Sequence, residues 1–322
     1  MACVKVNLTP KPLPLPVKTS SCPEMYYQRS MPYFNLFKGT KNTGSLIDPS
    51  CIFPDKYSYS QPCINPLNEF EFCFLRRENG VQSSANMDLL KYNFCTGQTL
   101  FLASHVTMMP DWGVNDWILF TGQNRNVWKV KSNGDSLIDL GVHGYRCQWN
   151  PSGTKFIING NQIFDDNGNL LNTLNIISTS ETWLNDSELV YNVSNEHPDS
   201  FILRKINTQN GIQYDLFSET KNGTSSICRF NRKSLNLYYS YGESYLKKYR
   251  SVNLGTGLKN TLGIYEQSFI QLFYTDIADN KTLIQQTLID TMTGDITKVN
   301  YRSHISIMNR DGSEERQIMI PE

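Results

Sequence analysis

The sequence predicts an all-β fold, a β-propeller built of four-stranded blades, and three observations lead to this prediction. A strand–turn–strand phrase recurs along the chain, a second hairpin with glycine at its turn follows each copy, and successive glycines are 34 to 46 residues apart. β-Branched and aromatic residues alternate with polar ones in these runs, which is the period of a strand rather than of a helix.

The first phrase combines an aromatic or aliphatic anchor, a tight polar turn and a short run of strand-forming residues. It is clearest in "QWNPSGTKFIIN" (148–159), recurs at 110–121, 181–192 and 228–240, and has looser copies at 63–75 and 265–275. Each copy predicts two antiparallel strands joined by a turn.

The second phrase places a glycine between two alternating runs. Its copies span 87–103, 126–141, 161–174, 201–217, 246–262 and 283–299, with the glycines at Gly97, Gly134, Gly168, Gly211, Gly257 and Gly294. Tight hairpin turns need a positive φ, which glycine adopts without strain. Each segment is therefore predicted to be a second hairpin.

One pair of phrases gives four strands in about 40 residues, which is the pattern of a propeller blade. A single blade cannot cover both of its apolar faces. Blades arranged radially cover one another, and a closed ring protects the outer edges of the sheets.

Six full repeats occupy about 63–300, and 304–320 is one further hairpin with Asp311 and Gly312 at its turn. The stretch 31–53 carries two more candidate strands. We therefore predict a single propeller domain over 31–322, with seven blades and a closing blade formed by 31–53 and 304–320. A six-bladed ring with both chain ends as trim is the alternative. Prolines at positions 10, 12, 14 and 16 predict a stiff N-terminal tether over 1–30.

The segments "WNPSGTKFII" (149–158) and "NVWKVKSNGD" (126–135) resemble the TolB-type, WD-like β-propeller repeats of bacterial envelopes. The resemblance extends over 63–320 and is sharpest at 110–160. Elsewhere the turn drifts to Asn185-Asp186-Ser187 or Asn231-Arg232-Lys233, which supports the fold more than any transfer of function. The resemblance implies a periplasmic or cell-surface protein, and the aspartates and glycines of these turns are expected to be structural.

The charge balance argues against several classes of partner. Lys and Arg number 30 and Asp and Glu number 30, so no electrostatic drive toward nucleic acid or an anionic membrane surface is expected. The sequence has no run of 18 apolar residues, so no membrane-spanning helix is expected. No signal peptide is recognisable at the start of the sequence as given.

The eight cysteines form no C-x-x-C pair, which disfavours a zinc ribbon or a thioredoxin-type site. Cys63, Cys73 and Cys95 lie in strand-like runs and are expected to be buried thiols. Cys22 and Cys51 lie in loop-like sequence and could pair in an oxidising compartment. Cys3 precedes the proline-rich tract, so it is a candidate for lipid attachment in a lipoprotein; a plain N-terminus is the alternative.

Three of the four histidines share one topological position. His105, His143 and His304 each follow the last strand of a repeat, on the way to the next repeat. In a propeller these crossings lie on one face near the central channel, where imidazoles could hold a divalent metal, with Asp111 as a further ligand. Chance placement of histidines in polar crossings is the alternative.

No catalytic set other than this metal site is recognisable. The chain has no Gly-x-Ser-x-Gly motif, and "LGTGLKNTLG" (254–263) lacks the spacing of a phosphate-binding loop. The tryptophans at positions 112, 117, 128, 149 and 183 could form a sugar-stacking platform, but four of them occupy repeat-anchor or strand positions, which predicts core packing. We therefore expect a monomeric, non-catalytic envelope module that needs no cofactor and binds a protein, peptide or glycan. A metal-dependent lyase or hydrolase acting on a carbohydrate is the alternative.

Overall fold

The structure of the chain is a computed structural model. It describes residues 29–30, 56–68, 70–78, 87–93, 96–176, 178, 180–193, 200–220, 224–231, 235–243, 246–265, 275–276, 281–290, 300–309, 316–318 and 320. Within these ranges the chain forms 24 β-strands and one short 3-10 helix, η1 (Gln123–Arg125), so the all-β prediction is confirmed. All strand pairs in the described residues are antiparallel.

The first sheet has seven strands in chain order. They are β2 (Tyr57–Ile64), β3 (Glu71–Glu78), β4 (Met87–Asn93), β5 (Thr99–Trp112), β6 (Trp117–Gly122), β7 (Asn126–Lys131) and β8 (Ile138–His143).

Strand β5 belongs to two meanders. Its first half, up to Val106, pairs with β4, and its second half, from Val106 to Trp112, pairs with β6. Next to this handover His105 adopts a φ of 58°, in the left-handed region. The seven-stranded sheet is thus two four-stranded meanders, β2–β5 and β5–β8, that share one bent strand.

Three sheets of four strands follow, each a meander in which neighbours in sequence are neighbours in space. The second sheet holds β9 (Cys147–Trp149), β10 (Lys155–Ile158), β11 (Gln162–Asp165) and β12 (Leu170–Thr173). The third holds β13 (Glu181–Asn185), β14 (Glu188–Val193), β15 (Ser200–Asn207) and β16 (Gln213–Thr220). The fourth holds β17 (Thr224–Asn231), β18 (Asn236–Glu243), β19 (Leu246–Asn253) and β20 (Lys259–Tyr265).

The last sheet joins segments from both parts of the chain, in the order β1-β24-β23-β22-β21. Its strands are β1 (Arg29–Ser30), β21 (Thr275–Asp276), β22 (Lys281–Asp290), β23 (Asn300–Asn309) and β24 (Arg316–Gln317). An N-terminal segment therefore does pair with the C-terminal hairpin, through β1 and β24. The stretch 31–53, which was expected to supply the closing strands, lies outside the described residues.

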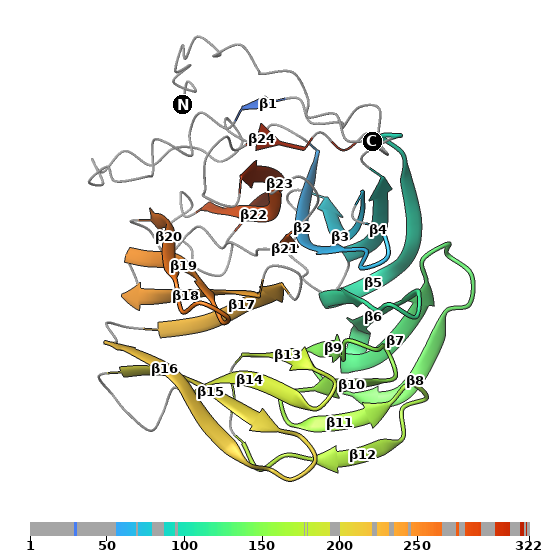
Figure 1. Cartoon of the computed structure of the whole chain (residues 1–322). Helices are drawn as coiled ribbons and strands as arrows, with labels where there is room; N and C mark the ends of the chain where they lie inside the picture. The colour runs from blue at the N-terminus through green and yellow to red at the C-terminus, as the bar shows by residue number, and fades with distance from the viewer. Residues whose placement is uncertain are drawn as a thin grey trace.

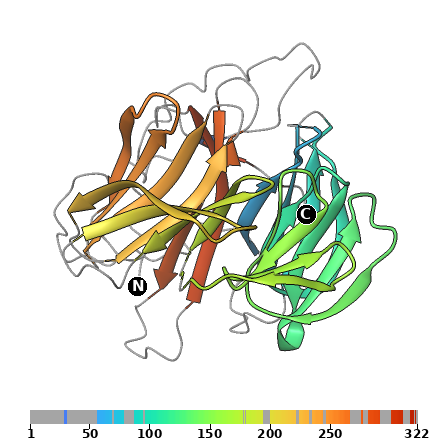
Figure 2. The same cartoon turned by 60° about the horizontal axis from the view of Figure 1, so that its bottom comes forward.

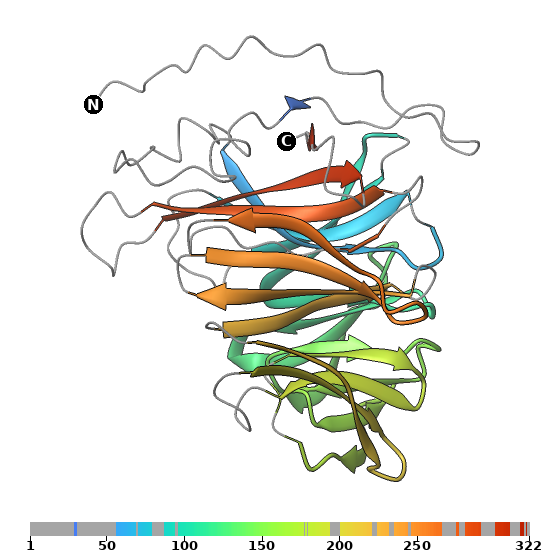
Figure 3. The same ribbon diagram turned by 60° about the vertical axis from the view of Figure 1, so that its left-hand side comes forward.

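The sheets succeed one another clockwise about a common centre in Figure 1. Figure 2 shows the green sheets and the yellow and orange sheets on opposite sides of the molecule, and Figure 3 shows β22–β23, β17–β20 and β13–β16 as successive layers. The first strands of the meanders contact one another: β2 contacts β5 and β21, β5 contacts β9, β13 contacts β17, and β17 contacts β21. The side chain of Gln148 joins β9 to β13 through hydrogen bonds with Thr182 and the Trp183 amide.

The first and last sheets also meet. The Ser303 amide donates to Ser58 Oγ at 3.0 Å, and the Gln61 amide donates to Gln285 Oε1 at 2.6 Å. One apolar cluster spans the two sheets and contains Tyr59, Phe72, Phe74, Leu90, Tyr92, Leu283, Ile305, Ile318 and Ile320. The blade count and the closure of the ring, together with the domain limits of 1–30 and 31–322, stay predictions.

The sequence-based turns are largely confirmed. Region 110–160 consists of strands, turns and the short 3-10 helix η1, and Gly97, Gly134, Gly168, Gly211 and Gly257 all have positive φ values between 68° and 88°. Gly294 lies outside the described residues. Cys63 and Cys73 are buried, as expected, and Cys147 is buried too. Cys95, Cys22 and Cys51 lie outside the described residues. The described residues contain no helix that is long and apolar enough to cross a bilayer.

Candidate binding surfaces

The meanders place their connections at two opposite ends of the sheets. We call one end the crossing face. It carries the described parts of the loops from one sheet to the next, at 144–146 and 174–176, and the middle hairpin turns at 123–125 and 159–161. The other end, the turn face, carries the first and last hairpin turns of the four-stranded meanders. There Asn115 Nδ2 donates to the Gly153 carbonyl and the Ser152 amide donates to Asp186 Oδ1 at 2.9 Å. These bonds tie turns of successive sheets together, so Asp186 has the structural role expected for these turns.

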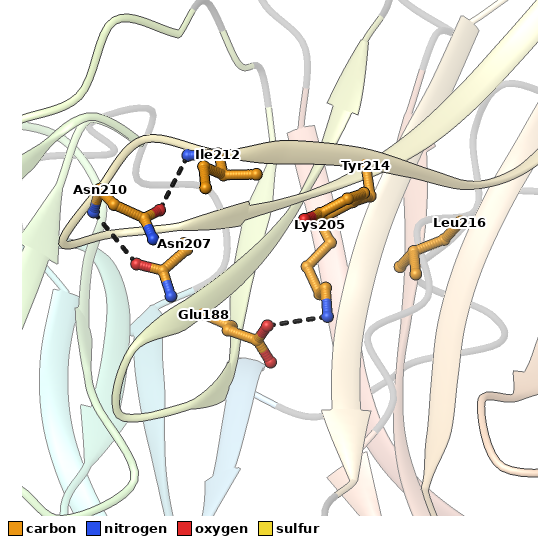
Figure 4. Close-up of a pocket in the computed structure, with 7 residues that line it drawn as sticks. All are labelled: Glu188, Lys205, Asn207, Asn210, Ile212, Tyr214 and Leu216. Atoms are coloured by element: carbon orange, nitrogen blue, oxygen red, sulfur yellow. Dashed lines mark hydrogen bonds and ion pairs between the residues drawn. The ribbon is translucent and has the colours of Figure 1, made fainter.

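A hollow of about 530 Å³ lies at the outer part of the third sheet (Figure 4). It is lined by Glu188, Lys205, Asn207, Asn210, Ile212, Tyr214 and Leu216. The residues come from β14, from β15 and its turn, and from the outermost strand β16.

The register of the strands shows which face of the sheet carries the hollow. Val190 lies opposite Lys205, which lies opposite Tyr214, and residues directly opposite in an antiparallel pair point to the same side. Val190 is buried in a cluster with Leu237 and Tyr239 of the fourth sheet. The hollow is therefore at the outer rim of the groove between the third and fourth sheets.

Three apolar side chains give the hollow its character. Ile212 is 48% exposed, Tyr214 is 58% exposed and Leu216 is 36% exposed. Side chains two residues apart on a strand share a face, and a register shift in the β15–β16 ladder brings Leu216 to the same rim. Tyr214 carries the largest share of this exposed apolar surface, and Lys205 Nζ lies 5.8 Å from the centre of its ring.

Two asparagines at the β15–β16 turn supply polar groups. Asn207 Oδ1 accepts the amides of Gln209 and Asn210, and Asn210 Oδ1 accepts the amide of Ile212 at 3.0 Å (Figure 4). The oxygens are therefore occupied by the turn, while neither Nδ2 group donates a hydrogen bond to another described residue. Two amide donors are left for a ligand.

An ion pair forms the remaining wall. Lys205 Nζ lies 2.7 Å from Glu188 Oε1, and Asn185 Nδ2 donates to Glu188 Oε2 at 2.7 Å. The hydrogen bond from Lys205 is the main reason that the pKa of Glu188 lies below its usual value, with smaller help from Asn185 and the lysine charge. Glu188 is thus held as a carboxylate, and the polar groups left over in the hollow are mainly donors.

The same groove is bridged further along by a charged cluster. Glu219 of β16 receives hydrogen bonds from Tyr239 Oη at 2.8 Å, Lys259 Nζ at 2.9 Å and Arg250 Nη1 at 3.1 Å. Burial raises the pKa of Glu219, but the bonds from Lys259 and Tyr239 and the charges of Arg250 and Lys259 outweigh it, so the pKa lies below its usual value. Burial and the bond to Glu219 raise the pKa of Tyr239. This cluster fastens β16 to the fourth sheet.

Two of the predicted metal-site histidines flank η1 on the crossing face. His105 Nδ1 lies 3.2 Å from Gln123 Nε2, and His143 lies opposite Asn126 in the β7–β8 ladder; both imidazoles are exposed. The backbone of His304 pairs with Gln286 in the last sheet, and the structure describes this residue's backbone only. In the described residues no three His, Cys, Asp or Glu side chains gather as metal ligands.

The metal site therefore stays a prediction. Elemental analysis of metal-replete protein tests it, with the parent compared with variants in which the three histidines are replaced by alanine. Asp111 is buried and accepts the Trp149 amide on Oδ2 at 2.7 Å, so it joins two sheets. Cys3, the predicted lipid-attachment residue, lies outside the described residues.

Core packing is confirmed for three of the tryptophans. Trp112, Trp149 and Trp183 are each at most 4% exposed. Trp117 is half-buried, with Lys129 Nζ and Lys131 Nζ lying 4.9 Å and 4.6 Å from its ring centre. Trp128 packs against the core of the first sheet.

Sequence reasoning did not find the hollow. The run "GIQYDLF" (211–217) alternates apolar and polar residues, which indicates a strand but not which of its faces is covered. Whether a face is covered depends on how far the fourth sheet extends over it, and the fourth sheet is formed by a different part of the chain.

No protein-family model matches the chain, and no curated protein matches its sequence. Solved structures do match in fold. A TolB protein from Agrobacterium tumefaciens is 10% identical with a TM-score of 0.51, over 71% of this chain and 86% of that one. The β-propeller domain of the Trilobed protease from Pyrococcus furiosus is 11% identical with a TM-score of 0.51, over 82% of this chain and 96% of that one.

An acylaminoacyl peptidase from Pyrococcus horikoshii is 12% identical with a TM-score of 0.51; the match covers 83% of this chain but 53% of the peptidase. Identities this low establish the fold and leave the activity open. The chain has a β-propeller fold similar to that of TolB.

Proposed function

We propose that this chain is a non-catalytic binding and scaffold module that holds a protein, peptide or glycan partner against the outer rim of its propeller. The hollow on the third sheet carries this proposal. Ile212, Tyr214 and Leu216 expose apolar surface next to two amide groups with unused donors, which is the usual composition of a recognition site.

The chemistry of the hollow favours a peptide among these partners. Its apolar wall suits an aliphatic or aromatic side chain, and its unused polar groups are the Nδ2 donors of Asn207 and Asn210. Backbone carbonyls are acceptors that such donors can bind. An apolar residue flanked by accessible carbonyls meets both requirements.

A rigid scaffold is part of the proposal, and we infer a closed ring of six blades. The shared strand β5 divides the first sheet into two meanders of four strands, which with the remaining four sheets makes six units. The contacts among the first strands and the bonds from Ser303 and Gln61 between the first and last sheets support closure. The seven-bladed alternative depends on 31–53.

We further propose that the protein works as a monomer in the periplasm or at the cell surface, behind a proline-rich tether over 1–30. The TolB-like fold supports this location. Lipid attachment at Cys3 is the finer part of the proposal, and mass spectrometry of the protein isolated from its native membrane would detect the modification.

The binding role can be tested with Tyr214→Ala. Tyr214 is 58% exposed, so its removal should leave the fold intact while it removes the largest apolar contact of the hollow. Capture from envelope extract, with the bound protein quantified, should recover a partner with the parent protein and lose it with the variant. Leu170→Ser is the matched control, because Leu170 is 56% exposed on the outermost strand of the second sheet. Equal recovery with Tyr214→Ala and the parent would reject the hollow as the binding site.

A further inference from the structure

The turn between β6 and β7 contains an arginine in an unfavourable backbone conformation. Asn124 and Arg125 have φ values of 56° and 66°. The equivalent turn of the next sheet, between β10 and β11, holds Asn159 at 54° and Gly160 at 79°. A residue with a side chain loses roughly 1 kcal/mol in this region, which glycine does not. Arg125 therefore stands where glycine would serve the fold better.

The side chain of Arg125 forms a stacked pair with Tyr145. The guanidinium carbon lies 4.1 Å from the centre of the Tyr145 ring, and Tyr145 is 42% exposed. The backbone holds both partners in place: the Gly144 amide donates to the Arg125 carbonyl at 2.8 Å, and the Tyr145 amide donates to Asn159 Oδ1 at 2.8 Å. The pair, which we call the Arg125–Tyr145 plate, is thus mounted rigidly on the crossing face.

Stacking covers one face of the guanidinium and leaves its N–H edges free. Within the part of the chain that the structure describes, Arg125 has no carboxylate partner and its guanidinium donates no hydrogen bond to protein. Arg146 follows Tyr145 in the same loop, where its side chain is 31% exposed and its guanidinium lies 3.9 Å from Glu181 Oε2. A planar fork of donors without a carboxylate partner, beside a second guanidinium, is a site for a planar acceptor.

The charges around the plate favour a carboxylate over a phosphate. Asp139 lies in β8, where it accepts from Asn126 Nδ2 at 3.3 Å and from the Gly141 amide at 2.9 Å. Together with Glu181 it offsets part of the local positive charge, so a single negative charge is matched better than a double one. The guanidinium covers one face of the Tyr145 ring, so that face cannot stack on a sugar ring.

We propose that the Arg125–Tyr145 plate is a second binding site, which takes a carboxylate of an acidic peptide segment bidentately on the guanidinium of Arg125. This site is independent of the rim hollow and lies on the other end of the molecule. The strain of the turn is then the consequence of placing an arginine at its tip.

The test is fluorescence anisotropy with labelled hexaglutamate, and with hexaglutamine as the neutral probe, at low and at physiological ionic strength. Arg125→Gly removes the fork and relieves the turn, so the melting temperature should be kept while hexaglutamate affinity falls by about tenfold, the loss expected for a charge-assisted bidentate bond. Asn124→Gly is the matched control, because it relaxes the same turn without removing a charge, and it should bind as the parent does. Arg125→Lys keeps the charge without the fork and should bind several times more weakly than the parent.

Several outcomes would overturn the proposal. One is equal affinity of Arg125→Gly and the parent, and another is equal binding of hexaglutamine. Displacement of hexaglutamate by equimolar inorganic phosphate would show that the site selects phosphate. Binding of oligogalacturonate without binding of hexaglutamate would assign the carboxylate to a sugar. Failure of Tyr214→Ala to affect partner recovery concerns the hollow alone and leaves this test unchanged.

Discussion

Trp183, in the first strand of the third sheet, donates its indole N–H to the backbone oxygen of Gln148 in the second sheet across 3.2 Å. Trp149 makes the same kind of bond one sheet earlier, to the backbone oxygen of Trp117 at 3.1 Å. Each of these side chains is at most 2% exposed. The repeated tryptophan therefore joins neighbouring sheets both by apolar burial and by one directed hydrogen bond.

Replacing Trp183 by phenylalanine should lower the free energy of unfolding by about 2 kcal/mol, because a buried carbonyl loses its donor and the smaller ring leaves space. Equilibrium unfolding in urea measures the change. The control is Trp117→Phe, at a half-buried position, for which less than about 1 kcal/mol is expected. Equal losses at the two positions would contradict a special role for the Trp183 bond.

A second prediction concerns the buried carboxylate of Glu181, whose side chain is 5% exposed. Burial raises its pKa above the ordinary 4.5, and the charge of Arg146 and a bond from Ser178 only partly offset this. Because the folded protein then holds the proton more tightly than the unfolded chain, this contribution to stability is complete below the unfolded pKa. It is lost as the pH rises through the folded pKa.

Glu181→Gln removes this dependence. The variant should be more stable than the parent at about pH 8, by about 1 to 3 kcal/mol, and the difference should shrink as the pH falls toward 4.5. Urea unfolding of both proteins over this pH range provides the comparison. A difference that is the same at every pH would mean that Glu181 titrates alike in the folded and unfolded states.

The charged cluster around Glu219 should respond to pH in the opposite sense. Its pKa lies below the ordinary value, so its contribution to stability is present above the unfolded pKa and is lost as the pH falls through the folded pKa. Glu219→Gln should therefore destabilise the protein by about 2 kcal/mol near neutral pH, and by less in acid, since the glutamate side chain is only 7% exposed.

Glu188→Gln is the control for this cluster, because Glu188 forms an ion pair with Lys205 at 26% exposure. A loss of about 0.5 kcal/mol is expected for a pair so open to water. Thermal unfolding of both variants at neutral and acidic pH tests the order. A larger effect at Glu188 would show that the link between β16 and the fourth sheet contributes little.

The sequence allowed prediction of the repeats because their signals are local. A glycine between two alternating runs is enough to predict a hairpin, and five such turns have the expected positive φ. The tryptophan anchors could be predicted to be buried for the same reason, because their position in the repeat is visible in the sequence itself. His105 lies within β5, next to the point where the two meanders that share this strand meet, and His143 is the last residue of β8.

Features that depend on two sheets at once could not be predicted this way. Glu219 reads as an ordinary polar residue at the end of a strand, and its partners Tyr239, Arg250 and Lys259 are 20 to 40 residues away. The exposure of Tyr214 depends on the reach of the neighbouring sheet. Nothing in the sequence singles out Arg125. An asparagine–arginine pair does not mark a tight turn in the way that asparagine–glycine does, so only the φ value of Arg125 reveals the strain.

The final prediction concerns Gly160, which packs directly against Glu181. A Cβ on Gly160 would lie 2.7 Å from Glu181 Oε2, and the residue also has a φ of 79°. Gly160→Ala therefore combines backbone strain with a steric conflict and should lower the free energy of unfolding by about 2 to 3 kcal/mol. Gly211→Ala isolates the strain, because Gly211 has a φ of 72° and open space at the Cβ position, so about 1 kcal/mol is expected there.

The steric part can be separated with a double mutant. Glu181→Ala should remove the two atoms closest to a Gly160 Cβ and leave Ser178 Cβ at 3.4 Å, an ordinary contact distance. In the Glu181→Ala background, Gly160→Ala should therefore lose only the roughly 1 kcal/mol of backbone strain. Urea unfolding of the parent, the two single variants and the double variant gives the coupling between the positions. Additive losses would mean that the loop at 159–161 moves away from Glu181 on substitution, and the close packing of the crossing face at this point would then be incidental to stability.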